Sequence, residues 1–312
     1  MDLVSRTIFP FQIVLGILGN FSCLCEHLFN HLSGRKARRT DLVVRHLTVA
    51  NALVILSRGV PETIAAFGHK HFLGDLGCKL VFYVHRVARG VSISTTCLLT
   101  AFQAIIISPM DSRWAELKAK SPKFIRSFSV LSWVLHMLIN IQVPVVMSGG
   151  RSNKNTTFTV DFGYCSAAAG NKGVDSALAT LVTFHDVLWF ALMLCTSGSM
   201  VFILHQHKKR VQHIHRRKVL PRSSPEIQAT QRILVLVSTF GSLYSFSSVI
   251  YFYFYFFDET AGWLLNTSAL VNACFPTASP FILMSYSCTH ELHMFMPGRN
   301  KPSSQFRRTQ TV

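Results

Sequence analysis

Long apolar runs, each bounded by charged or turn-forming residues, follow one another along the whole chain. A bilayer core about 30 Å thick is crossed by about 20 apolar residues in an α-helix, so runs of this length predict membrane spans. The predicted spans are residues 8–30, 42–66, 77–107, 127–148, 177–205, 227–257 and 264–286. The pattern predicts an all-α protein in which residues 1–312 form a single bundle of seven transmembrane helices, with 287–312 as a tail.

The connections between these runs carry most of the cations and indicate the orientation. Residues 32–41, 108–126, 206–226 and the tail after 287 hold four, five, seven and four Lys or Arg residues. The alternating set, before the first run and at 67–76, 149–176 and 258–263, holds one, one, three and none. Because cytoplasmic loops are enriched in Lys and Arg, we expect the N-terminus outside and the C-terminus in the cytoplasm.

The net charge of +17 raises the alternative of a soluble, basic, nucleic-acid-binding protein. Hydrophobic residues make up 49% of the chain and charged residues only 14%, which is too apolar for one soluble core. The aromatic residues interleave with aliphatic residues and not with the cations, as in the run 251–257 (YFYFYFF), which indicates an interfacial aromatic belt. We therefore expect a multi-pass membrane protein that contacts lipid and binds no nucleic acid.

Two cysteines fall in the predicted outer segments, Cys78 at the head of the third span and Cys165 in the long outer loop. The extracellular side is oxidising, which favours a disulfide between them over the alternative of two free thiols. Asn155 opens a glycosylation sequon in the same loop. On the inner side, Cys288 is either a palmitoylation site or a plain juxtamembrane thiol.

Ionisable residues inside the spans indicate a site, because a charge at the bilayer centre costs about 2.5 to 3.5 kcal/mol on insertion scales. They lie at similar predicted depth in spans two, three and five: Arg58, Glu62, His85, Arg86, Arg89, His185 and Asp186. Possible wall residues beside them are Trp189, Tyr251, Phe254 and Asn272. Two interpretations remain open, a polar cavity that binds a ligand and pairs between helices that hold the bundle together.

Chemistry of other kinds has no support in the chain. The basic run 205–218 contains four histidines, but without structured neighbouring ligands it indicates a solvated loop that meets anionic lipid or an acidic partner. The chain has no phosphate-binding Gly-rich loop, no Gly-x-Ser-x-Gly and no His-Glu-x-x-His. We expect neither catalysis nor a cofactor nor a metal.

Several stretches resemble one receptor family. They are HLTVANALVILSRGVPETIAAFG (46–68), CKLVFYVHRVARGVSISTTCLLTAFQAIIISP (78–109), SPEIQATQRILVL (224–236) and FPTASPFILM (275–284). Together with a sequon placed ten residues before Cys165, they are similar to the vomeronasal type 1 receptors, which are G-protein-coupled pheromone receptors. The chain departs from the wider rhodopsin-like class: Gln103–Pro109 stands where Asp-Arg-Tyr is expected, Ser279-Pro280 replaces Asn-Pro-x-x-Tyr, and span six lacks Cys-Trp-x-Pro.

The resemblance implies a plasma-membrane receptor that binds small pheromone-like molecules in the outer half of the bundle and activates heterotrimeric G proteins of the inhibitory (Gi/Go) type. His85 occupies the position where many amine receptors carry a carboxylate, which argues against simple cationic amines. A bitter taste receptor is the nearest alternative, since that family shares the same departures. A secondary transporter is a weaker alternative because no internal repeat is visible and the number of spans is odd. The identity of the ligand and the oligomeric state stay open.

Overall fold

The computed structural model describes the backbone of residues 3–34, 40–69, 72–108, 112–149, 159–161, 164–168, 172–214, 225–257 and 262–295. Most of these residues are helical. The helices are α1 (Leu3–Leu32), α2 (Asp41–Val54), the π-helical η1 (Ile55–Gly59), α3 (Val60–Ala66), α4 (Asp75–Ile107), α5 (Ser112–Ile139), α6 (Val143–Val146), α7 (Lys172–Ile214), α8 (Pro225–Phe257) and α9 (Gly262–Phe295). Side chains are not described at several helix ends, including residues 248–257 of α8 and 285–295 of α9.

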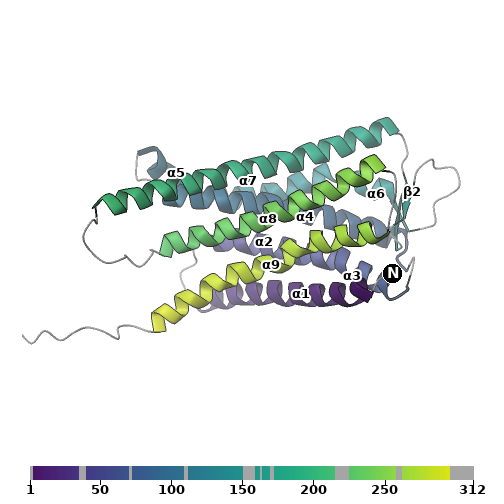
Figure 1. Ribbon diagram of the computed structural model, residues 1–312, viewed down its shortest axis with the longest axis horizontal. Helices are drawn as coiled ribbons and strands as arrows, with labels where there is room; N and C mark the ends of the chain where they lie inside the picture. The colour runs from purple at the N-terminus through teal and green to yellow at the C-terminus, as the bar shows by residue number, and fades with distance from the viewer. Residues whose placement is uncertain are drawn as a thin grey trace, which may run out of the picture.

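The long helices run side by side along the long axis of the molecule (Figure 1). Among the described residues, six segments are long and apolar enough to cross a membrane: Thr7–Leu32, Asp41–Ala66, Asp75–Ile107, Lys123–Val146, Phe184–Gln206 and Thr267–Met284. α8, with 33 residues, has the length of a seventh. The N-terminus lies at the end of the bundle that holds β2 and α6, and α7 extends toward the opposite end (Figure 1). The prediction of an all-α transmembrane bundle is confirmed.

The second predicted span, 42–66, is helical throughout but contains one turn of π-helix, η1, between α2 and α3. Pro61 stands at the start of α3. Proline has no N–H to donate and its ring displaces the carbonyl of the preceding turn, so a locally wider turn keeps the remaining backbone groups paired. The periodicity of the sequence gives no indication of this change of pitch.

The fourth predicted span, 127–148, differs most from the structure. Its helix, α5, begins at Ser112, ends at Ile139, and is followed by a turn and the short α6. Pro144 lies in the first turn of α6, where a missing N–H costs nothing, and a single helix through this position is disfavoured. The span was predicted from the apolar stretch of this helix alone. The helix itself begins earlier in the chain, in a polar segment that the apolar pattern does not include.

α4 is the central helix of the bundle. In its most apolar window 72% of the residues are buried, whereas the corresponding window of α7 is only 11% buried. The main hydrophobic cluster packs around the second half of α4 and includes Leu47, Ile93, Leu99, Phe102, Leu236 and Phe275. Side chains on successive turns of α4 therefore face several neighbouring helices, and this position makes α4 the principal wall of any internal cavity.

A small antiparallel sheet covers the outer end of α4. Its strands are β1 (Met147–Ser148), β2 (Thr159–Asp161) and β3 (Ser166–Ala168), in the order β1-β3-β2. A disulfide joins Cys78 to Cys165, with their Cα atoms 5.7 Å apart, and confirms the predicted pairing. Tyr164 beside it is 1% exposed and stacks on Phe82 of α4 with the ring centroids 5.9 Å apart. We call the three strands with residues 164–165 the outer lid.

Candidate functional site

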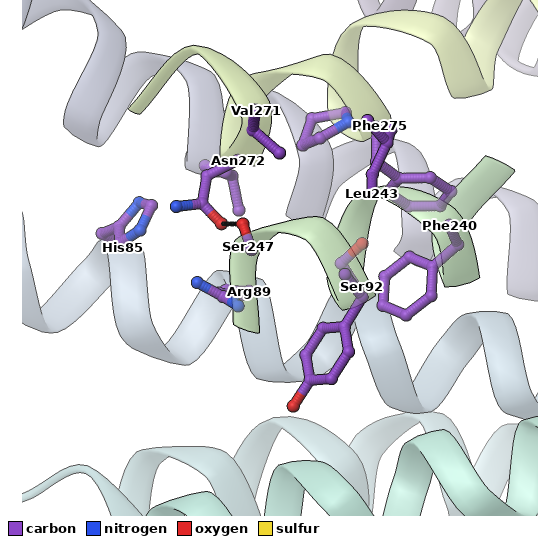
Figure 2. A pocket seen from close by; sticks show the side chains of 12 residues that line it. His85, Arg89, Ser92, Phe240, Leu243, Ser247, Val271, Asn272 and Phe275 are labelled. Atoms are coloured by element: carbon purple, nitrogen blue, oxygen red, sulfur yellow. Dashed lines mark hydrogen bonds between the residues drawn. The ribbon is translucent and has the colours of Figure 1, made fainter. Parts of the chain in front are cut away.

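A pocket of about 450 Å³, counted with its open side, lies between α2, α4, α8 and α9 (Figure 2). Its lining combines aromatic and aliphatic side chains with a few polar groups. We call it the central pocket, and its residues are Val54, His85, Arg89, Ser92, Phe240, Leu243, Tyr244, Ser247, Val271, Asn272, Phe275 and Pro276. A mostly apolar pocket with a few convergent polar groups is typical of a site for a small organic molecule.

Helical spacing brings these residues together. His85, Arg89 and Ser92 lie four and three residues apart on α4 and so share one face. At 1.5 Å per residue, His85 and Arg89 lie roughly 10 and 17 Å below Cys78, which is the outer half of a membrane span. Phe240 of α8 packs edge to face with Phe275 of α9, with the ring centroids 4.7 Å apart. The aromatic pair forms an apolar part of the wall, away from the cation.

The polar groups of the central pocket offer both donors and acceptors. Ser247 donates a hydrogen bond of 2.9 Å to the side-chain oxygen of Asn272, which links α8 to α9 (Figure 2). The guanidinium carbon of Arg89 lies 5.9 Å from the centre of the Tyr244 ring. His85 is 6% exposed, and its Nδ1 atom has no hydrogen-bond partner among the described residues. A ligand with a polar group would find a buried imidazole nitrogen and a guanidinium on the same helix.

A second, much smaller cavity lies between α4, the end of α5 and α7. We call it the lateral chamber, and its residues are Arg86, Arg89, Gly90, His136, Ile139, Asn140, His185 and Asp186. Arg89 lines both cavities, so the two share part of one wall. The described lining of the lateral chamber is polar and charged, in contrast to the mostly apolar central pocket.

His185 is held in one orientation by its neighbours. Trp189, one turn later on α7, donates its indole N–H to His185 Nε2 at 2.8 Å. This bond requires the Nδ1 atom to carry the proton of a neutral ring, and Nδ1 lies 3.6 Å from the Asp186 carboxylate. The ring of His136 packs against His185 edge to face, with the centroids 4.8 Å apart. Both nitrogens of His185 are thus engaged by its own helix.

Arg58 and Glu62 form an ion pair, with Nε and Oε1 2.6 Å apart, as their spacing around Pro61 predicts. Their side chains are 17% and 15% exposed, and neither lines the central pocket or the lateral chamber. Burial raises the pKa of the Tyr164 phenol in the outer lid, and the Glu62 carboxylate raises it further, so the phenol stays neutral at physiological pH. Because Arg58 and Glu62 pair with each other and line neither cavity, the structure favours the interpretation that this pair holds the bundle together.

The structure divides the predicted site residues into groups. His85, Arg89 and Asn272 line the central pocket, while Arg86, Arg89, His185 and Asp186 line the lateral chamber. Trp189 lines neither and positions His185. The side chains of Tyr251, Phe254 and Cys288, and the sequon residue Asn155, lie outside the described residues.

Sequence reasoning missed most of the apolar wall, which includes Phe240, Tyr244 and Phe275. Apolar residues in an apolar helix carry no pattern that separates a pocket wall from a lipid-facing or core position. His136 was also missed, although a signal was present: it is a histidine inside the fourth predicted span, and intramembrane ionisable residues are functional candidates by default.

Comparison with known families gives a match over nearly the whole chain. The family described as "Vomeronasal organ pheromone receptor family" matches residues 3–295. The match includes every helix that lines the central pocket and the lateral chamber.

Individual relatives agree with this match. The protein named vomeronasal type-1 receptor 2 from Homo sapiens is 52% identical over 274 residues, which are 88% of this chain and 69% of that protein. Vomeronasal type-1 receptor 4 from Homo sapiens is 50% identical over 284 residues, or 91% of this chain and 94% of the relative. Vomeronasal type-1 receptor 3 from Homo sapiens is 50% identical over 275 residues, 88% of each chain.

Proposed function

The chain belongs to the vomeronasal organ pheromone receptor family, and from this premise we propose that it binds small pheromone-like molecules in the central pocket and activates G proteins of the Gi/Go type. Membership of the family makes it a seven-helix, G-protein-coupled pheromone receptor of the membrane and not an enzyme. The family predicted from the sequence is thus confirmed. The ligand class, its position and the type of G protein are the proposal.

The observation that carries the proposal is the lining of the central pocket. Hydrophobic walls from α8 and α9 face two polar groups of α4, His85 and Arg89, and the pocket lies in the outer half of the bundle. Among the described lining residues none is a carboxylate. A small molecule with an apolar body and one hydrogen-bonding group fits such a cavity, whereas a primary ammonium group would leave its charge unpaired beside Arg89.

A route from the pocket toward the cytoplasm begins at Ser92. Its hydroxyl lines the central pocket and donates a hydrogen bond of 2.7 Å to the Asn51 side-chain oxygen. The amide nitrogen of Asn51 donates in turn to the Ser279 hydroxyl of α9 at 2.7 Å. An agonist shifts the receptor only if it binds the active arrangement of helices more tightly than the resting one. A ligand group that takes the Ser92 hydroxyl from Asn51 has this property if the Ser92–Asn51 bond is broken in the active arrangement.

Nucleotide exchange on purified G proteins tests the proposal. The receptor in lipid nanodiscs is screened against small organic molecules in the presence of Gi, Gs or Gq heterotrimers, and agonists are expected to accelerate exchange on Gi alone. Ser247→Ala removes a polar group of the central pocket and is expected to shift agonist potency by about fivefold, the effect of one lost hydrogen bond of about 1 kcal/mol.

Ser242→Ala is the matched control, because Ser242 also lies on α8, is exposed, and bonds only within its own helix. Equal potency at the wild type, Ser247→Ala and a second pocket variant, Phe275→Ala, would contradict the assignment of the pocket. Exchange on Gs in place of Gi would contradict the coupling type and leave the pocket intact. Solute uptake by receptor-containing vesicles without any nucleotide exchange would favour the transporter alternative.

A further inference from the structure

Several polar groups of the central pocket already have a side-chain partner. Ser92 donates its hydroxyl proton to the side-chain oxygen of Asn51. On the opposite wall, Ser247 donates to the side-chain oxygen of Asn272 (Figure 2). Two further polar residues of α4 line the pocket, and their hydrogen bonds within the described part of the chain are incomplete.

The first of them, His85, lacks a hydrogen-bond donor. Its side chain is 6% exposed, and its Nδ1 atom has no partner among the described residues. The backbone carbonyl of Val54 accepts a hydrogen bond from the same ring. A neutral imidazole has a single N–H, so the bond to Val54 leaves Nδ1 as an acceptor. A buried acceptor without a donor is costly, and a molecule that donates to it would remove this cost.

The charge beside His85 favours the neutral ring that this reasoning requires. Arg89 follows His85 by four residues on α4, so the two side chains share one face, with their Cβ atoms about 6 Å apart. A protonated ring would place a second cation next to the guanidinium in a buried cavity inside the membrane, which is costly. We therefore treat His85 as a neutral acceptor.

Arg89 offers the complementary group. Its guanidinium carbon lies 5.9 Å from the centre of the Tyr244 ring, and the described residues give it no hydrogen bond or ion pair. A guanidinium group only donates hydrogen bonds, so its partner must be an acceptor. The pocket therefore presents an acceptor and a donor one helical turn apart on the same wall. A hydroxyl group can serve both with a single oxygen, because it donates its proton and accepts on its lone pairs.

We propose that the central pocket selects molecules that carry a hydroxyl group on an apolar body, with the hydroxyl donating to His85 and accepting from Arg89. The inference rests on the proposed function in one respect, that the ligand lies in the central pocket. A ketone of the same shape can accept from Arg89 but leaves His85 without a donor. A primary ammonium group can donate to His85 but places its charge beside that of Arg89.

Thermal unfolding of the receptor in phosphatidylcholine nanodiscs tests the selection with cyclopentanol, cyclopentanone and cyclopentylamine, which share one carbon ring. A ligand that binds only the folded state raises Tm as its concentration increases. Cyclopentanol is expected to bind about tenfold more tightly than cyclopentanone, because the ketone leaves a buried acceptor unpaired. Cyclopentylamine is expected to give no stabilisation. The measurement needs no G protein.

Substitutions at the two residues separate their roles. His85→Leu removes the acceptor and is expected to abolish the preference for the alcohol. His85→Gln is expected to retain the preference, because a glutamine side chain both donates and accepts. Arg89→Met is expected to weaken the binding of alcohol and ketone by the same factor, so their ratio stays unchanged. Because the preference is a ratio measured within one variant, a change in the baseline Tm does not affect it.

His46→Leu is the matched control, because His46 is a histidine of α2 that bonds Trp133 and lines neither cavity. It is expected to keep the wild-type preference. Equal binding of cyclopentanol and cyclopentanone to the wild type, no stabilisation by either, or an unchanged preference in His85→Leu would each overturn the proposal. The comparison in the wild type decides the question even if a variant fails to fold.

Nucleotide exchange separates this inference from the proposed function. A preference for the alcohol in thermal unfolding, without any agonist-driven exchange, supports the selection and counts against the signalling that we propose. Exchange driven equally by alcohols and by ketones of the same skeleton overturns the selection alone and leaves the proposed function intact.

Discussion

The outer and inner halves of this bundle use different chemistry to hold the same helices. Above Ser92 on α4, the described interior contains ionisable groups and two cavities, with His85, Arg86, Arg89 and His136 around them. From Ser92 inward, hydroxyl and amide side chains join α4 to α2, α7 and α8 within a closely packed hydrophobic cluster. The described inner half also contains a contact of 4.0 Å between His27 and Asp41, which joins α1 to α2. The described cavities and most of the ionisable groups therefore lie together in the half where we propose that the ligand binds.

The neutral contacts of the inner half cross between helices at three levels. Asn51 of α2 bonds Ser92 of α4 and Ser279 of α9. Below it, the hydroxyls of Thr100 and Thr196 join α4 to α7 at 2.9 Å. Nearest the cytoplasm, Gln103 Nε2 donates to the Thr230 hydroxyl of α8 at 3.0 Å, and both residues are buried.

The difference between the halves concerns the cost of rearrangement. Hydrogen bonds between transmembrane helices contribute about 0.6 kcal/mol on average, whereas removing one partner of a buried ion pair costs about 3 to 5 kcal/mol. Helices joined by neutral groups can exchange partners at small cost, which suits the half that must open toward a G protein. The charged half, where we propose that the ligand binds, costs more to rearrange. Four substitutions test this contrast, in order of decreasing effect.

Cys165→Ser removes the covalent link that holds the outer lid over α4. The disulfide spans a sequence separation of 87 residues, and a crosslink across a loop of that size stabilises the folded state by about 4 kcal/mol. We expect a large fall in Tm and in surface expression. Cys195→Ser, at an exposed free cysteine of α7, is the control and should leave both unchanged. A Cys165→Ser receptor as stable as the control would show that the lid does not stabilise the outer half.

Gly90→Ala tests the packing between α4 and the lateral chamber. The added methyl group would overlap the His136 ring, and overpacking of this kind costs about 2 kcal/mol. Thermal unfolding of the purified receptor should report the loss. At Gly198 of α7 an added Cβ meets no atom within 4 Å, so Gly198→Ala should be neutral or slightly stabilising. Equal Tm values for Gly90→Ala and Gly198→Ala would mean that the ring of His136 can move aside to admit the added methyl group.

Asn51→Ala removes both hydrogen bonds that link α2 to α4 and α9. At the average value for such bonds, the loss of stability is about 1 kcal/mol. Asn140→Ala is a control because Asn140, in the turn after α5, is also buried and its amide donates to the His136 carbonyl of α5, one turn earlier in the chain. A smaller fall in Tm is expected for the control. If Asn51→Ala has the same Tm as the wild type, the polar contacts in the middle of the bundle do not contribute to its stability.

Gln103→Leu removes the contact nearest the cytoplasm. We expect basal nucleotide exchange to rise about threefold, because the resting arrangement loses a bond of about 0.6 kcal/mol. Thr230→Val should have the same effect, and the double variant should add nothing to it. Thr239→Val, at a half-buried position of α8 whose hydroxyl bonds its own helix, should keep the basal rate. Additive effects of the two single substitutions would show that the residues do not act as a pair.

The sequence predicted the number of helices, their orientation across the membrane and one disulfide. Apolar runs of membrane length and the alternation of Lys and Arg depend only on transfer between water and lipid, so they are local properties that can be counted along the chain. The pairing of Cys78 with Cys165 was predictable because they are the only two cysteines in the predicted outer segments. Arg58 and Glu62 were predictable as a pair because one helix presents both.

Other features depended on contacts that no local pattern carries. The π-turn before Pro61 and the end of α5 before Pro144 follow from how individual backbone groups are satisfied in three dimensions. The separation of His85 from Arg86 into different cavities follows from the rotation of α4 against its neighbours, although the residues are adjacent in the sequence.

The sequence by itself determined that this protein is a seven-helix receptor of the vomeronasal family with charges in its outer half. Only the tertiary structure decided which of those charges face each other, which line a cavity, and that His136 joins them. The physical reason is that partition into lipid acts on each segment separately, whereas a cavity exists only where several packed helices leave space between them.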